Sequence, residues 1–168
     1  MADADALFSA HRDGVFRYLC RIVGHGDAGE LTQEVFLRVA RGPVPGTGDA
    51  GCRAWIFMIA RNLALNHVRD RRRRGVQVEA VEASVGPVQE LTVALREVLD
   101  RLAPLDRDVF LMRESAGLGY HEIATACDLS PDAVRSRLHR TRQELRALLK
   151  PMLRESHASG GVRLYDKS

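Results

Sequence analysis

Apolar residues recur every three or four positions along most of the chain, and this spacing limits the fold more than any other feature of the sequence. The first such stripe runs through Phe8, His11, Val15, Leu19 and Val23. This spacing places side chains on one face of an α-helix, whereas a half-buried strand alternates at every second residue. No segment alternates convincingly enough for a sheet. The chain is therefore predicted to be all-α.

Glycine and proline divide the helical pattern into segments. Breaks at residues 24–26, at the Gly- and Pro-rich residues 42–48 and at Gly75 separate three helices in the first half. In the second half, Pro104 ends one helix and residues 117–119 close the next.

The stretch between these two sets, residues 76–89, is small and acidic and contains a Gly-Pro pair. It is predicted to be an interdomain linker, although its alternating valines leave a short strand as the alternative. We therefore predict two small helical domains joined by a flexible linker. The predicted boundaries are residues 1–75, a linker at 76–90, residues 91–150 and a C-terminal tail at 151–168.

Composition excludes several classes of protein. The chain has 168 residues, of which 45% are hydrophobic and 28% charged, a balance that supports packed cores and not wholesale disorder. Its three cysteines are far apart, so neither a disulfide framework nor a metal site is expected. No apolar run reaches the roughly 18–20 residues of a membrane span, and the first residues are acidic. We expect a cytoplasmic protein without a cofactor and without membrane insertion.

The charge is distributed unevenly along the chain. The net charge is only +3, but residues 53–74 contain seven arginines and one acidic residue, which gives +6. Residues 131–150 carry +4, and residues 75–119 carry −4. Of the 25 basic residues 23 are arginine, whose guanidinium forms forked contacts with phosphate and guanine. This distribution predicts two surfaces that face nucleic acid, one in each domain.

Residues 120–142 have the pattern of a helix-turn-helix. A short apolar helix with small residues precedes Leu129, Ser130 is a predicted N-cap, and Pro131 occupies the first position of the next helix. The apolar side chains of this second helix are predicted to face inward and its arginines outward. Such a helix can lie in the major groove of DNA. A solvated amphipathic helix in a bundle is the alternative.

The helix that ends in four consecutive arginines also carries Trp55, Asn62, Asn66 and His67. Asparagine and histidine can bond base edges, and tryptophan can stack on an unpaired base. Trp55 has a second interpretation, because its spacing with Ile56 and Ile59 is also that of a core residue.

The sequence resembles a known family in both halves. Residues 33–38 (Gln-Glu-Val-Phe-Leu-Arg) and 55–69 look like region 2 of bacterial RNA polymerase sigma factors, and residues 102–114, 117–124 and 134–142 look like region 4. Only a linker separates the two regions, which resembles the extracytoplasmic-function subfamily. The similarity covers roughly residues 7–150.

This resemblance implies a non-enzymatic subunit that directs core RNA polymerase to promoters. Region 2 is then expected to bind the β′ clamp helices and to capture the melted −10 element as a single strand. Region 4 is expected to read the −35 element as duplex and to contact the β flap, and an anti-sigma factor is expected as a further partner.

The candidate residues follow from the matching positions. The candidates for core polymerase binding are Gln33, Glu34, Phe36 and Arg38. The candidates for −10 DNA binding are Arg53, Trp55, Arg61, Asn62, Asn66, His67, Arg69, Arg71, Arg72, Arg73 and Arg74. The candidates for −35 DNA binding are Ser130, Asp132, Ala133, Arg135, Ser136, Arg137, His139, Arg140 and Arg142.

The sequence leaves two other classes of function to weigh, a stand-alone DNA-binding regulator and an enzyme. A stand-alone helix-turn-helix regulator would explain residues 120–150 and would be expected to dimerise, but it gives the arginine helix no role. An enzyme is disfavoured, because the histidines show no ligand spacing and no nucleophile or phosphate-loop motif is present. The tail is predicted either to fray or to pack on the second domain through Val162, Leu164 and Tyr165.

Overall fold

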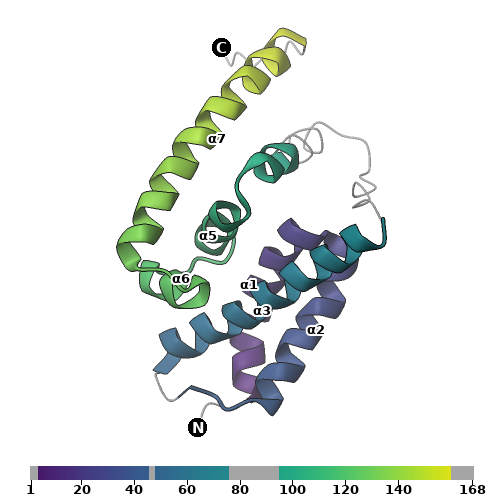
Figure 1. The fold of residues 1–168 in the computed structure, drawn as a ribbon, viewed down its shortest axis with the longest axis vertical. Coiled ribbons are helices and arrows are strands. Elements are labelled where there is room, and N and C mark those ends of the chain that lie inside the picture. Colours follow the sequence, from purple (N-terminus) through teal and green to yellow (C-terminus); the bar gives the residue numbers. More distant parts are fainter. Residues whose placement is uncertain (1–3, 46–47, 76–94, 160–168) are drawn as a thin grey trace, which may run out of the picture.

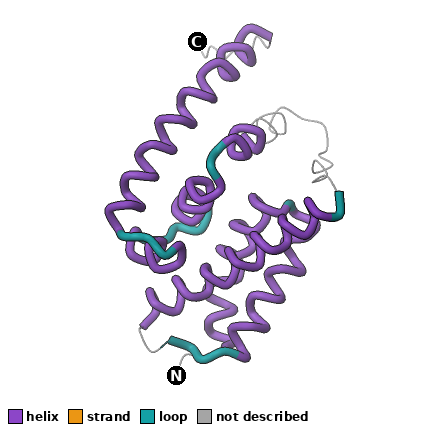
Figure 2. Tube along the Cα trace, in the orientation of Figure 1, coloured by secondary structure: helices purple, strands orange, loops and turns teal. Residues whose placement is uncertain are grey.

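The computed structural model describes residues 4–45, 48–75 and 95–159, with side chains as far as residue 151. Every regular element in this described part of the chain is a helix (Figure 2), so the all-α prediction is confirmed. The predicted linker at 76–90, its alternative strand and residues 160–168 lie outside the described residues.

Three helices form a bundle in the first half: α1 (Ala4–Val23), α2 (His25–Arg41) and α3 (Gly48–Arg73) (Figure 1). α2 begins directly after Gly24, whose φ of +90° reverses the chain in a conformation that favours glycine. The predicted stripes supply the core, because Val15, Leu19, Val35 and Val39 are all buried. Phe8, the first residue of its stripe, was predicted to face the core with the others, but its side chain is 39% exposed.

The second half contains a helical segment at residues 95–101, then α5 (Pro104–Glu114), α6 (Tyr120–Cys127) and α7 (Pro131–Ser159). Pro104 separates the first two helices and occupies the first turn of α5, where its missing N–H costs no helical hydrogen bond. α7 runs along the outer side of the second half and projects beyond it (Figure 1).

α7 is longer than the sequence predicted. The C-terminal tail was predicted to begin at residue 151, but the helix continues through Pro151 to Ser159. A proline removes one backbone donor and crowds the carbonyl four residues before it, but residues 152–158 are mostly good helix formers, and the helix continues past the interruption. The first part of the predicted tail is therefore helical.

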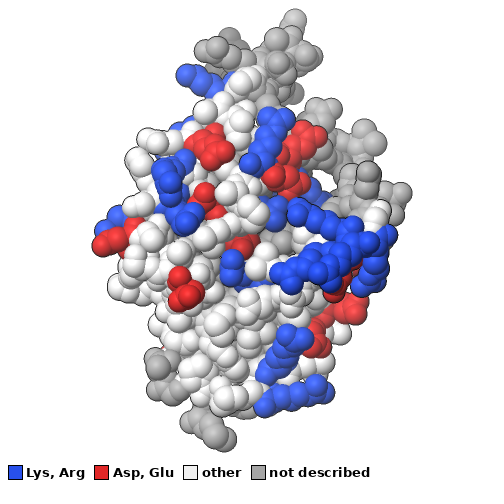
Figure 3. Space-filling model, in the orientation of Figure 1, with Lys and Arg blue, Asp and Glu red and all other residues white. Residues whose placement is uncertain are grey.

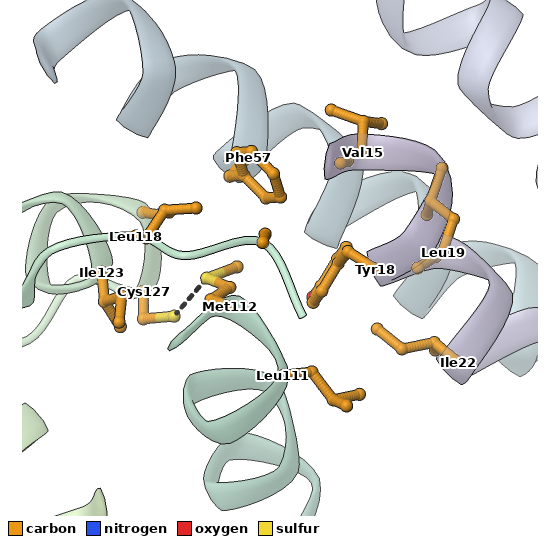
Figure 4. Close-up of a cluster of buried hydrophobic side chains, with 14 of the residues drawn as sticks. Val15, Tyr18, Leu19, Ile22, Phe57, Leu111, Met112, Leu118, Ile123 and Cys127 are labelled. Atoms are coloured by element: carbon orange, nitrogen blue, oxygen red, sulfur yellow. Dashed lines mark hydrogen bonds between the residues drawn. The ribbon is translucent and has the colours of Figure 1, made fainter. Parts of the chain in front are cut away.

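The two halves pack against each other, and their buried residues form one hydrophobic cluster. Tyr18 of α1 and Phe57 of α3 point toward side chains of the second half, among them Met112 of α5 and Leu118 in the loop before α6 (Figure 4). α3 packs on α6, and α1 packs on α5. The elements expected of two domains thus share a continuous core.

Candidate nucleic-acid interface

The α6–α7 junction has the geometry of a helix-turn-helix. Asp128 ends α6 in the left-handed conformation with a φ of 54°, and the next N–H, that of Leu129, donates to the Ala124 carbonyl. Ser130 then caps α7, because its Oγ accepts from the Ala133 N–H at 3.1 Å. The predicted N-cap is confirmed, and Leu129 is partly buried against the core as the turn requires.

α7 presents one face to the core and the opposite face to solvent. Val134, Leu138 and Leu145 are buried, as predicted. Five of the −35 candidates within α7 are exposed, and so is Ser130 just before it: the five are Asp132, Arg135, Ser136, His139 and Arg140. These residues lie on the first three turns of the helix, the part that enters a major groove in this motif.

Two of the −35 candidates are used to hold α7 in place. Arg137 donates to the Asp106 carboxylate of α5 at 2.7 Å, and neither side chain is more than 28% exposed. Arg142 donates to Glu114 at the end of α5, also at 2.7 Å, and this hydrogen bond raises the pKa of Arg142. Both pairs fix the angle between α5 and α7.

Tyr120, at the start of α6, is a residue that the sequence candidates omitted. Its ring lies 5.2 Å from the guanidinium carbon of Arg113 and 5.8 Å from that of Arg135. Guanidinium groups at this range are attracted to an aromatic face. The ring therefore constrains the exposed Arg135 side chain. The sequence did not indicate this contact, because it depends on how closely α7 approaches the start of α6.

The solvent face of α3, together with Arg74 directly after the helix, carries six of the eleven −10 candidates. Asn62, Asn66, Arg69, Arg72, Arg73 and Arg74 are all exposed. Arginine side chains gather over the C-terminal end of α3 in the space-filling view (Figure 3). Met58 is 36% exposed one turn before Asn62 and adds an apolar group to this face, which the candidate set lacked.

His67 and Arg71 face α2 within the first bundle. Both side chains donate to the same oxygen of Asp27, from 2.9 Å and 2.5 Å respectively. Burial alone would raise the pKa of Asp27, but the hydrogen bonds from His67 and Arg71 outweigh it and lower the pKa. The cluster ties the start of α2 to the end of α3.

Trp55 is half-buried, and its ring packs against the backbone at Gly42. A Cβ atom on Gly42 would lie 3.1 Å from a ring carbon of Trp55. Part of the Trp55 ring therefore packs inside the protein, as one of its two interpretations expected. A side chain at position 42 would crowd this ring, which explains the glycine there.

Arg53 and Arg61 of α3 face the second half of the molecule. Arg53 donates to the Ala116 carbonyl at 2.5 Å and lies 3.7 Å from Glu122. Arg61 donates to Asp108 at 2.9 Å, and the Asp108 side chain is only 2% exposed. Burial raises the pKa of Asp108, and Arg61 offsets part of that effect. The Tyr18 hydroxyl also approaches this carboxylate, without the geometry of a regular hydrogen bond.

The candidates for polymerase binding lie on α2 but do not form one exposed set. Phe36 is 8% exposed, and its ring meets the edge of Phe8 at a centroid distance of 4.9 Å, so it belongs mainly to the core. Gln33 is exposed, and Arg38 donates to Glu34 at 2.9 Å across one turn. Leu37 is 47% exposed beside them and is an apolar group that the candidate set omitted.

Comparison with known proteins decides the family. The model for sigma-70 region 2 matches residues 7–74, and the model for sigma-70, region 4 matches residues 92–145. The ECF RNA polymerase sigma-E factor of Escherichia coli (strain K12) is 32% identical over 166 residues, which cover 88% of this chain and 87% of that protein. The chain belongs to the ECF family of RNA polymerase sigma factors.

Other relatives of this sigma factor are longer than it is. The probable ECF RNA polymerase sigma factor SigI of Mycobacterium tuberculosis is 32% identical over 156 residues, which cover 83% of this chain and 53% of SigI. SigE of Mycolicibacterium smegmatis is 34% identical over 166 residues, which cover 89% of this chain and 62% of SigE. The chain therefore spans between about half and three-fifths of the length of these two relatives.

Two solved structures share the fold of this sigma factor. RpoE of Bartonella quintana, solved with the anti-sigma factor NepR, superimposes with a TM-score of 0.69 at 22% identity, over 87% of this chain and 96% of that one. CnrH, solved with the cytosolic domain of CnrY, gives a TM-score of 0.65 at 22% identity, over 88% of each chain.

Within its described residues, this sigma factor has no group of His, Cys, Asp and Glu side chains that could hold a metal ion. Burial raises the pKa of Cys127 to about 11, so its thiol stays protonated and unreactive near neutral pH. Among the described residues, no helix has both the length and the apolar character that crossing a membrane requires.

Proposed function

We propose that this protein binds core RNA polymerase, directs it to a subset of promoters and helps to melt the −10 element, without catalysing a reaction itself. The observation that carries the proposal is the presence of two exposed basic faces on separate helices, α3 and α7, in one sigma-type chain. A major-groove helix suits duplex readout, whereas asparagines beside arginines suit an unpaired strand.

The −35 element is read in this proposal by the exposed side chains near the start of α7. Arg135, Ser136, His139 and Arg140 have the solvent access that base and phosphate contacts need. Arginine can bond O6 and N7 of guanine together, and Ser136 can meet a base edge or a phosphate. Arg137 and Arg142 act instead through the position of α7, because Asp106 and Glu114 hold them.

The −10 element is captured in this proposal by the solvent face of α3. Asn62 and Asn66 offer hydrogen bonds to base edges, and Arg69 with residues 72–74 follows the sugar-phosphate backbone. His67 and Arg71 support that face through Asp27.

The proposed partners are protein as well as DNA. We assign Gln33, Glu34, Arg38 and the exposed Leu37 to contact with the polymerase β′ clamp helices, and we expect region 4 to contact the β flap. RpoE and CnrH were each solved with a second protein, NepR and CnrY. By analogy we propose that an anti-sigma factor binds this chain, which would work in the cytoplasm beside the polymerase.

Run-off transcription with core polymerase and a library of randomised promoters tests the proposal. Transcripts are expected only when this protein is present and only from promoters that share −35 and −10 sequences. Arg140→Ala is expected to reduce initiation and relax one −35 position. Arg146→Ala removes the same charge from an exposed position six residues further along α7 and serves as its control.

A stand-alone regulator would behave differently. It would bind a specific duplex with nanomolar affinity in the absence of polymerase and would form a dimer in light scattering. Either result, together with no transcription from any promoter, would overturn the proposed function.

A further inference from the structure

Tyr120 lies where three helices of the second half meet, and arginines of the other two lie against its ring. The guanidinium carbon of Arg113, near the end of α5, lies 5.2 Å from the ring centroid, and that of Arg135, in the first turns of α7, lies 5.8 Å away. The Tyr120 hydroxyl also contributes, after Glu114, to the raised pKa of Arg142 on α7. One side chain of α6 thus interacts with cations of both neighbouring helices.

The position of this ring is fixed by the backbone that leads into α6. Leu118 is fully buried, and its carbonyl accepts a hydrogen bond from Arg113 at 2.8 Å. Gly119 then caps α6, since its N–H donates to the Glu122 carboxylate at 2.6 Å. Tyr120 follows as the first residue of α6, half-buried and packed against the hydrophobic core. The ring is therefore a fixed surface, whereas the arginine beside it has a long side chain with many rotamers.

Arg135 is exposed, yet two groups of the protein hold its side chain. Besides its contact with the Tyr120 ring, it donates to Asp132 at 2.9 Å across one turn of α7, and these two charged side chains are 66% and 88% exposed. An ion pair as exposed as this one is weak and is screened by salt. An aromatic ring attracts a guanidinium without using its hydrogen-bond donors, so the N–H groups that Asp132 does not engage stay available to DNA. The ring is thus the better support for a side chain that must still read a base.

Holding an arginine in place before it binds has a measurable consequence. Ordering one side chain with many rotamers at an interface weakens binding by about two- to tenfold. A side chain that is already held in its reading position avoids part of this cost. Arg140 provides the comparison, because it is exposed more than one turn further along the same helix.

We infer that Tyr120 is a positioning residue for −35 recognition: its ring holds Arg135 ready to read a base, and so sets how sharply one position of the −35 element is selected. The inference rests on the proposed function, because the ligand of Arg135 is taken to be promoter DNA. It adds a residue that contacts no base itself and controls specificity through its neighbour.

Two substitutions separate the ring from the hydroxyl. Tyr120→Phe keeps the ring, whereas Tyr120→Leu replaces it with an aliphatic side chain. Holoenzyme assembled with each variant is assayed by run-off transcription from promoters with a randomised −35 element and by binding to one selected promoter. Tyr120→Leu is expected to weaken promoter binding by about two- to tenfold and to relax the same −35 position that Arg135→Ala relaxes. Tyr120→Phe should match the unaltered protein in both measurements.

A double-mutant cycle distinguishes the positioning of Arg135 from general support of α7. Tyr120→Leu should add little to the effect of Arg135→Ala, because the side chain that the ring positions is already absent. Its effect should be additive with that of Arg140→Ala. Full additivity with Arg135→Ala, or equal coupling with both arginines, would overturn the proposal. Equal losses in Tyr120→Phe and Tyr120→Leu would also overturn it, since they would assign the effect to the hydroxyl.

Nuclear spin relaxation of the arginine Nε–H groups tests the same proposal in the free, unaltered protein. On the picosecond to nanosecond timescale Arg135 should move with smaller amplitude than Arg140. Equal mobility of the two side chains would overturn the proposal, and this measurement decides it even if circular dichroism shows that Tyr120→Leu does not fold.

Run-off transcription by the unaltered protein is measured in parallel. Transcription by the unaltered protein with no change of −35 selectivity in a folded Tyr120→Leu would remove the positioning role and leave the proposed function standing. The absence of transcription from any promoter would overturn the proposed function and, with it, this inference.

Discussion

At the scale of single residues, the partner of each arginine decides its role. Arg140 is exposed on α7, Arg137 is held by Asp106, and the partly buried Arg61 is paired with the buried Asp108. The sequence placed all three among the DNA-binding candidates, because the residue type and the helix were the available signals. Their partners lie 31 and 47 residues away for Arg137 and Arg61, so local sequence patterns could not sort them.

Arg137→Ala should therefore mainly lower stability, whereas Arg140→Ala should mainly weaken promoter binding. Arg137→Ala removes a partly buried charged hydrogen bond and should lower the free energy of unfolding by about 1 to 2 kcal/mol, measured by urea denaturation. Arg140→Ala should leave that energy nearly unchanged and cost about 1 to 3 kcal/mol in promoter binding by the holoenzyme, with relaxed preference at one −35 position. A stable Arg137→Ala protein with lost −35 specificity would show that Arg137 leaves Asp106 and contacts a base.

The Asp27 cluster should make stability depend on pH. Because the hydrogen bonds from His67 and Arg71 lower the pKa of Asp27 below its unfolded value, its contribution is present above about pH 4 and is lost as the pH falls through the folded pKa. Thermal unfolding of the wild type and Asp27→Asn should differ at neutral pH and converge as the buffer is made more acidic than pH 4. A constant difference across this range would exclude the assigned role of the carboxylate.

At the scale of elements, local signals predicted the helix-turn-helix well. Ser130, Pro131 and the inward stripe of α7 are all placed as their sequence pattern indicated, because caps and helical periodicity act over a few residues. The length of α7 and the exposure of Phe8 were predicted wrongly. The exposure of Phe8 depends on what the rest of the chain packs against, which periodicity does not contain. The extension of α7 follows from the good helix formers after Pro151, which outweigh the proline as a stop signal.

Ser130→Ala tests the capping assignment. Loss of the hydrogen bond to the Ala133 N–H should lower the free energy of unfolding by about 1 kcal/mol. Ser136→Ala changes an exposed serine inside the same helix and should alter stability far less. Equal effects of the two substitutions in urea denaturation would mean that the cap contributes nothing measurable.

At the scale of the whole molecule, the feature that the sequence could not supply is the contact between the halves. Two basic helices and an acidic segment were visible in the sequence, but nothing local indicated that Tyr18 would be fully buried where α1 meets α5. The shared cluster predicts that both halves unfold together in a single thermal transition.

Tyr18→Ala should break that cooperativity. Removal of the buried ring should cost about 3 to 5 kcal/mol, and calorimetry should show two transitions instead of one. Tyr18→Phe is the matched control, because the hydroxyl lacks a regular hydrogen bond and its loss should be nearly neutral. A single transition for Tyr18→Ala would show that the halves are coupled elsewhere.

α3 carries two faces that are subject to different constraints over evolution. Successive residues of a helix are about 100° apart, so Arg61 can face the second half while Asn62 beside it faces solvent. Substitutions on the solvent face can alter which promoters are chosen without disturbing the packing between the halves. Lineages of this family can therefore diversify in target sequence while the buried face of the same helix changes slowly.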